Sequence, residues 1–148
     1  MKKIVVAFSL LLTVGLTSAF ANDPKVNASV LASFKNEFSF IKDAKWTVGD
    51  EYTKAVFILA DRRIEAYFSN EGEYLGSARD LLFNQLPMAV INSMNKRFGA
   101  TGVYEIVERS IGAETFYYLT VEYANKVLRI EATPSGGLSI IKKVRKEK

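Results

Sequence analysis

The chain has 148 residues, of which 49% are hydrophobic and 24% are charged, and it carries a formal net charge of +4. It contains neither cysteine nor histidine. This composition excludes disulfide bonds, zinc-finger ligation, thiolate nucleophiles and any mechanism that needs an imidazole base, and its apolar content is that of a folded domain.

The N-terminal stretch has the pattern of a secretory signal peptide. The chain starts with the basic Met1-Lys2-Lys3, residues 4–16 carry no charge, and Ala19-Phe20-Ala21 has the small residues of a cleavage site. We expect residues 1–21 to be removed, which leaves a single domain over residues 22–148. Loss of two lysines lowers the formal net charge from +4 to +2. The pattern predicts export, to the periplasm or out of the cell.

Two amphipathic helices are predicted, one at the start of each half of this domain. The first covers residues 26–40, with Asn27 suited to the N-cap, and the second covers residues 86–98, with Pro87 in its first turn and Gly99 after its last. Apolar residues recur at helical spacing and indicate one buried face on each helix. These residues are Val30, Leu31, Phe34 and Phe38 in the first helix and Val90, Ile91, Met94 and Phe98 in the second.

The remaining segments alternate apolar and polar residues between turn signals, which is typical of strands. Eight strands are predicted, over residues 44–48, 52–60, 63–69, 74–81, 103–110, 115–123, 126–133 and 138–145. Tight turns such as Asn70-Glu71-Gly72 join them, so neighbouring strands are expected to pair antiparallel.

The second half of the domain repeats the first. A shift of 64 positions places Phe34 on Phe98, Tyr52 on Phe116, Ile64 on Leu128 and Gly72 on Gly136. We therefore predict an α+β fold, built as a tandem repeat of one helix plus four antiparallel strands over residues 26–82 and 84–146. The strands would form one eight-stranded antiparallel sheet with both helices on one face.

The other face of that sheet is predicted to have no protein layer over it. Because side chains alternate along a strand, this open face should carry a mixture of aromatic and charged residues. The candidate binding residues on it are Lys54, Arg63, Glu65, Tyr67, Phe116, Tyr118, Arg129 and Glu131. Tyrosine and arginine are enriched at the hot spots of protein interfaces, so the face is a candidate binding surface.

A set of residues, through its order and spacing, resembles a family of exported bacterial proteins. The set comprises Trp46, Tyr52, Phe57, Tyr67-Phe68-Ser69-Asn70-Glu71-Gly72, Leu86-Pro87, Val90, Ile91, Phe98 and Tyr117-Tyr118. The family is the beta-lactamase-inhibitor-like, PepSY-like family, and the resemblance covers nearly all of residues 22–148. It implies the same tandem repeat, and the family is named after a secreted inhibitor whose curved sheet face grips an enzyme. It implies no catalytic residue, cofactor or substrate.

We therefore expect a non-enzymatic binding protein that contacts a protein or peptide through the open face. One alternative is a carrier that holds a small apolar molecule between the helices and the sheet. Another is a hydrolase that uses Glu65 and Glu131 as paired carboxylates, although Arg63 and Arg129 are near enough in sequence to pair with them.

No metal, cofactor or nucleic acid is expected as a partner. Export and a formal net charge of only +2 after removal of residues 1–21 argue against nucleic acid. The run from Lys142 to Lys148 holds five positive residues among seven. Such a run either binds an anionic surface such as lipid headgroups or keeps a final edge strand soluble and unpaired.

Overall fold

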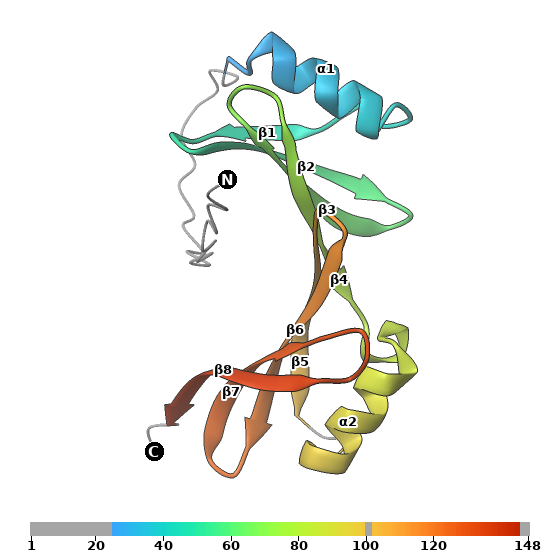
Figure 1. The fold of residues 1–148 in the computed structure, drawn as a ribbon, viewed down its shortest axis with the longest axis vertical. Coiled ribbons are helices and arrows are strands. Elements are labelled where there is room, and N and C mark those ends of the chain that lie inside the picture. The colour runs from blue at the N-terminus through green and yellow to red at the C-terminus, as the bar shows by residue number, and fades with distance from the viewer. Residues whose placement is uncertain (1–24, 100–101, 146–148) are drawn as a thin grey trace, which may run out of the picture.

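The computed structural model describes residues 25–99 and 102–145, so the predicted signal peptide lies outside the described residues. The described chain contains two α-helices, one short 3-10 helix and eight strands. All eight strands belong to one antiparallel sheet, in which the spatial order equals the order in the sequence. The predicted α+β fold, with its tandem repeat of one helix and four strands, is confirmed (Figure 1).

The bounds of the strands differ from the predicted ranges by at most one residue, whereas both α-helices are shorter than predicted. The helices are α1 (Ala28–Glu37), η1 (Phe83–Gln85) and α2 (Met88–Phe98). The first four strands are β1 (Lys45–Val48), β2 (Tyr52–Leu59), β3 (Arg62–Ser69) and β4 (Tyr74–Leu81). The last four are β5 (Val103–Ile111), β6 (Glu114–Tyr123), β7 (Lys126–Ala132) and β8 (Leu138–Arg145).

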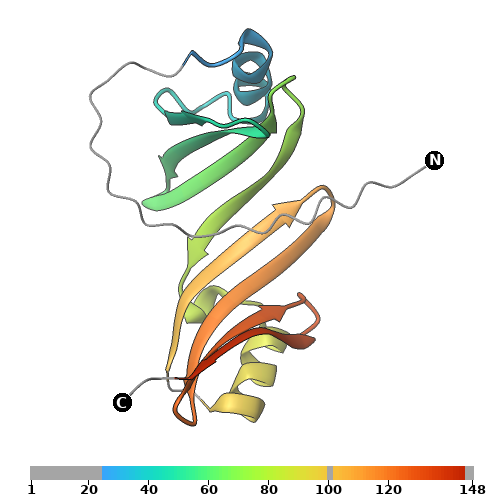
Figure 2. The ribbon, with the colours of Figure 1, turned by 90° about the vertical axis from the view of Figure 1, so that its left-hand side faces the viewer.

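The sheet curves into an arc, and both helices lie on its outer side (Figure 1). Figure 2 looks onto the inner side, where the strands of the second repeat lie in front of α2 and α1 is seen above the strands of the first repeat. We call this inner side the concave face. The strand register places on it Lys54, Val56, Ile58, Arg63, Glu65, Tyr67, Ala78, Asp80, Val107, Arg109, Phe116, Tyr118, Thr120, Arg129 and Glu131.

Each helix covers its own hydrophobic cluster on the outer side of the sheet. The cluster beneath α1 contains Val30, Phe34, Ala55, Phe57, Ile64, Ala66 and Phe68. The cluster beneath α2 contains Leu86, Val90, Met94, Phe98, Ile106, Tyr117, Leu119, Val121, Leu128, Ile130 and Ala132. Full burial of a large apolar side chain contributes about 1.5–3 kcal/mol, so these clusters hold the helices on the outer side.

The β3–β4 and β7–β8 turns have the same geometry. Each contains a glycine whose N–H donates to the carbonyl three residues earlier, over 3.0 Å at Gly72 and 2.9 Å at Gly136. Both glycines have a positive φ, of 101° and 89°. A Cβ on Gly72 would lie 2.8 Å from the backbone of Ser29 in α1, and one on Gly136 would lie 2.6 Å from the carbonyl oxygen of Ala89 in α2. Each turn therefore requires glycine, because it is pressed against a helix.

The first helix is shorter than predicted, and one residue of its stripe is misplaced. The Asn27 side chain caps it as expected, by accepting a hydrogen bond from the Ser29 N–H at 3.2 Å. Leu31 was predicted to be buried but is 45% exposed. Val30 and Phe34 already face the sheet, and Leu31 is turned about 100° away from Val30 around the helix axis.

The edges of the sheet are β1 and β8. Lys142 and Lys143 of the basic C-terminal run lie on β8 and are exposed, and residues 146–148 lie outside the described chain. Lysines on an edge strand disfavour pairing with a further strand. Neither described α-helix is long and apolar enough to cross a membrane.

Candidate functional site

All eight candidate residues project from the concave face, in two groups. Lys54 of β2 and Arg63, Glu65 and Tyr67 of β3 form the first group, on adjacent strands of the first repeat. Phe116 and Tyr118 of β6 and Arg129 and Glu131 of β7 form the second, on the equivalent strands of the second repeat. Strands β4 and β5 lie between the two groups.

The first group is organised around the carboxylate of Glu65. The hydroxyl of Tyr67 donates a hydrogen bond to it, Arg63 forms an ion pair at 2.5 Å, and the Lys54 ammonium lies 3.7 Å away. Tyr67 also packs edge-to-face on Tyr52, with ring centroids 5.6 Å apart, and is only 7% exposed. Tyr67 was expected to be an accessible contact residue, but the structure makes it a buried part of the concave face.

The second group is organised around the ring of Tyr118. Its hydroxyl donates to Oε2 of Glu131 over 2.8 Å, across the β6–β7 pair. Above the ring lies the guanidinium of Arg109, 4.6 Å from the ring centroid. Arg129 lies opposite Thr120 in the register, and Phe116 lies opposite Arg109. Half-buried aromatic and arginine side chains thus meet at the centre of the concave face.

Burial raises the pKa of both tyrosines in the two groups. For Tyr118, loss of hydration has the largest effect on the pKa, and the hydrogen bond to Glu131 and the charge of that carboxylate raise it further. The pKa of Tyr67 is raised well above its usual range for the same reasons, with Glu65 as the acceptor. The positive charge of Arg109 opposes the rise in pKa of both tyrosines. Both hydroxyls are neutral donors at pH 7.

The structure separates the two carboxylates that a hydrolase would need. Glu65 lies on β3 and Glu131 on β7, four strand positions apart in the sheet. At about 4.8 Å per strand this is about 19 Å along the sheet, whereas paired glycosidase carboxylates lie about 5–9.5 Å apart. Each carboxylate is also engaged by neighbouring side chains, so the two do not form a catalytic pair.

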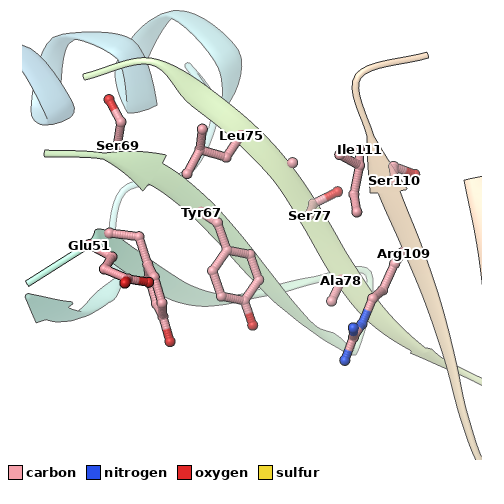
Figure 3. Close-up of a pocket in the computed structure, with 11 residues that line it drawn as sticks. Glu51, Tyr67, Ser69, Leu75, Ser77, Ala78, Arg109, Ser110 and Ile111 are labelled. Atoms are coloured by element: carbon pink, nitrogen blue, oxygen red, sulfur yellow. The ribbon is translucent and has the colours of Figure 1, made fainter. Parts of the chain in front are cut away.

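A pocket of about 450 Å³ lies on the concave face where the two repeats meet, and we call it the junction pocket (Figure 3). It is lined by Glu51, Tyr52, Tyr67, Ser69, Leu75, Gly76, Ser77, Ala78, Arg109, Ser110 and Ile111. The carrier hypothesis placed a cavity between the helices and the sheet, whereas this pocket lies on the face opposite to both helices. Of the eight candidate residues, only Tyr67 lines it.

Small residues and a bulge on β4 create the junction pocket. Gly76 and Ala78 lie opposite Tyr67 and Glu65 in the register, and Leu75 is an extra residue on the bulged strand. Gly76 has a φ of 148°, and a Cβ there would lie 2.2 Å from the carbonyl oxygen of Ser110 in β5. The positions of β4 between Tyr67 and Arg109 on the concave face, Gly76 and Ala78, therefore carry no large side chain. Figure 3 shows Tyr67 and Arg109 pointing to the same side of the sheet.

Most residues of the junction pocket that the sequence prediction missed come from β4 and β5; the others are Glu51, Tyr52 and Ser69. Leu75, Ala78, Arg109 and Ile111 line the pocket because β4 and β5 pair and thereby join the two repeats. The run Gly76-Ser77-Ala78 was the available signal, since three small residues in a strand mark a position where something else can approach closely.

Fold and surface together define a class: an open antiparallel sheet, backed by two helices on one side, with an aromatic and charged concave face on the other. Solved structures with a similar fold include a BLIP-like protein from Bacteroides fragilis, with 22% identity and a TM-score of 0.71 over 82% of this chain and 89% of that one. A DUF2874 family protein from Bacteroides ovatus has 17% identity and a TM-score of 0.70, over 85% and 89% of the two chains.

A candidate periplasmic protein from Bacteroides eggerthii is similar to the same extent, with 17% identity and a TM-score of 0.69 over 81% of this chain and 88% of that one. No model of a known family and no curated protein matches the sequence. The structural neighbours show that the chain has a BLIP-like fold, and at these identities they show the fold alone.

Proposed function

We propose that the protein is an exported, non-enzymatic binding protein that contacts a protein or peptide partner through its concave face. The signal-peptide pattern of residues 1–21, the BLIP-like fold and the candidate periplasmic neighbour support this proposal. Membership of the beta-lactamase-inhibitor-like, PepSY-like family is part of the same proposal. In this role the protein acts in the periplasm or outside the cell.

The observation that carries the proposal is a group of large side chains on a face that neither helix covers. Arg109, Phe116 and Tyr118 lie half-buried near its centre, next to the junction pocket. Aromatic and arginine residues at the centre of a surface are the usual anchors of protein interfaces. A curved sheet surrounds a convex partner segment on two sides, so these anchors would lose water on binding.

The proposal is tested by removing the central ring of this surface. Residues 22–148 serve as bait for native cell-envelope proteins, beside the variants Tyr118→Ala and, as a control on exposed α2, Lys96→Ala. We expect the parent and control baits to retain a partner that Tyr118→Ala loses, without a large fall in melting temperature. Retention of the same proteins by all three baits would contradict the proposal.

A second candidate function, a carrier of small apolar ligands, is favoured by the volume of the junction pocket. Its volume of about 450 Å³ lies in the range of small-molecule sites, which is about 300–1,000 Å³. In this role the ligand would lie on the concave face rather than beneath the helices. A bound apolar molecule that copurifies with the protein, detected by mass spectrometry of an organic extract, would support the carrier function.

A further inference from the structure

The cationic side chain in the junction pocket, Arg109, lacks a counter-charge. Within residues 25–99 and 102–145 it forms no ion pair and no hydrogen bond. Glu65 and Glu131 are engaged by the partners described above, and Glu108, its neighbour in the chain, is held in an ion pair on the outer side. A half-buried charge without a counter-charge is unfavourable, so the position of Arg109 points to an anionic ligand.

The guanidinium of Arg109 has N–H donors that no carboxylate of the described residues engages. Its central carbon lies over the Tyr118 ring, 4.6 Å from the ring centroid. The N–H groups of a guanidinium point outward from its edge, where they match the two oxygens of a carboxylate. The contact with Tyr118 restrains the side chain, and the N–H groups remain available for a carboxylate.

The rest of the junction pocket suits an apolar group. Tyr52, Tyr67, Leu75 and Ala78 line it, and Ile111 at its margin is 49% exposed. An apolar group placed there would remove the surface of Ile111 from water, which contributes about 25 cal/mol for each Å² covered.

Glu51 lies at the end of the pocket that is farthest from Arg109 (Figure 3). Its carboxylate is exposed and therefore screened by water, but it would repel a second negative group nearby. The pocket therefore suits a ligand with a single anionic group, bound by Arg109. The apolar part of the ligand would lie between Arg109 and Glu51.

We infer that the junction pocket binds the C-terminal residue of a peptide, with an apolar side chain in the pocket and the terminal carboxylate on Arg109. This inference rests on the proposed function and names what the partner presents. A peptide is favoured over a free acid because the pocket opens onto the concave face, where Phe116 lies opposite Arg109 and offers contact to the preceding residues. Recognition of a terminal carboxylate is one of the recurring modes of peptide binding.

The inference is tested with an N-acetylated, fluorescently labelled tripeptide that ends in phenylalanine, and with the same peptide as its C-terminal amide. Fluorescence anisotropy gives the dissociation constants of both for the purified protein. We expect the amide to bind at least tenfold more weakly than the acid. The variant Arg109→Gln should weaken the acid to the level of the amide and leave the affinity for the amide unchanged, because only the acid uses the charge.

Two further variants show whether such a loss is specific. Lys96→Gln removes a positive charge from the exposed surface of α2, on the outer side of the sheet, and both peptides should bind it as they bind the parent. Ala78→Leu fills the pocket from β4, and both peptides should bind it at least tenfold more weakly.

Equal affinity for acid and amide, or an equal loss of both in Arg109→Gln, would overturn the inference. Binding of 3-phenylpropionate as tightly as the acid peptide would overturn the peptide as the source of the carboxylate. If Tyr118→Ala loses an envelope partner while acid and amide bind alike, the proposed function stands and only the carboxylate site fails.

Discussion

The two repeats are alike on the outer side of the sheet and different on the concave face. On the outer side, Phe34 and Phe98 occupy equivalent buried positions, and Gly72 and Gly136 make equivalent turns against the helices. The β2–β3 and β6–β7 turns match as well, because Ala60-Asp61 and Ala124-Asn125 all have positive φ values, between 49° and 61°. The buried phenylalanines and the tight turns, which stabilise each repeat, are thus equivalent in the two repeats.

The concave face has diverged at equivalent positions. The cross-strand pair Lys54 and Tyr67 in the first repeat corresponds to Tyr118 and Glu131 in the second. The tyrosine has therefore moved from one strand of the pair to the other, although in both repeats its hydroxyl donates to a glutamate. Side chains that no helix covers are released from packing constraints, so differences between the repeats concentrate where a partner would bind.

The largest expected effects come from the equivalent core phenylalanines. Phe34→Ala and Phe98→Ala should each lower the free energy of unfolding by about 3–5 kcal/mol. Phe34 should cost more, because its ring contacts four other rings at centroid distances of 5.0–6.2 Å, whereas Phe98 contacts Tyr123 at 5.4 Å. Urea denaturation measures both, and a cost below about 1 kcal/mol in either would show that its helix is not anchored there.

The turn glycines should give the next largest effect. Gly72→Ala and Gly136→Ala add a Cβ within 2.8 Å of helix backbone at a positive φ, and each should cost about 1–3 kcal/mol. Gly112→Ala is the matched control, because Gly112 has a φ of 58° with nothing within 4 Å of the added Cβ. Thermal melts should rank both turn variants below the control. Equal melting temperatures would mean that the turns are not pressed against the helices in solution.

The smallest effects concern the two tyrosine hydroxyls and depend on pH. Tyr67→Phe and Tyr118→Phe should each cost about 1 kcal/mol at pH 7, through loss of a hydrogen bond. The folded pKa of each tyrosine is raised, so the stability from each hydroxyl is present below about pH 10, the unfolded value, and is lost as the pH rises toward the folded pKa.

The difference in unfolding free energy between parent and variant should therefore shrink above about pH 10, and more for Tyr67, which has the larger rise in pKa. Urea denaturation at pH 7 and pH 10.5 measures it. A difference that grows with pH would contradict the assignment of the hydroxyls as neutral donors.

The fold could be predicted from the sequence because its signals are local. The alternation along residues 126–133 and the helical spacing of Val90, Met94 and Phe98 each belong to a single element, and both correspond to observed elements. Asn27, Pro87 and Gly99 mark helix ends by their own backbone and capping properties. The short η1 was missed, since three residues are too few to give a periodic signal.

The junction pocket could not be predicted because it depends on contacts between the repeats. Arg109 reaches Tyr118 and the pocket only because β5 pairs with both β4 and β6. The bulge at Leu75 shifts the register by one residue. The alternation of apolar and polar residues does not reveal the position of such a bulge. Alternation assigned Tyr67 to the correct face, next to Glu65 of the same strand. Its contact with Tyr52 of β2 could not be predicted, because that contact depends on how β2 and β3 pair.

The sequential order of the strands has a consequence for how the chain folds. Each strand pairs with its neighbours in sequence, and the cluster beneath α1 contains only residues that precede β4. Contacts that are close in sequence give a low contact order, which favours rapid folding. If the N-terminal half emerges first, the cluster beneath α1 could therefore form before the second half is present. The strands of the second half could then pair, one after another, with the edge of the sheet that has already formed.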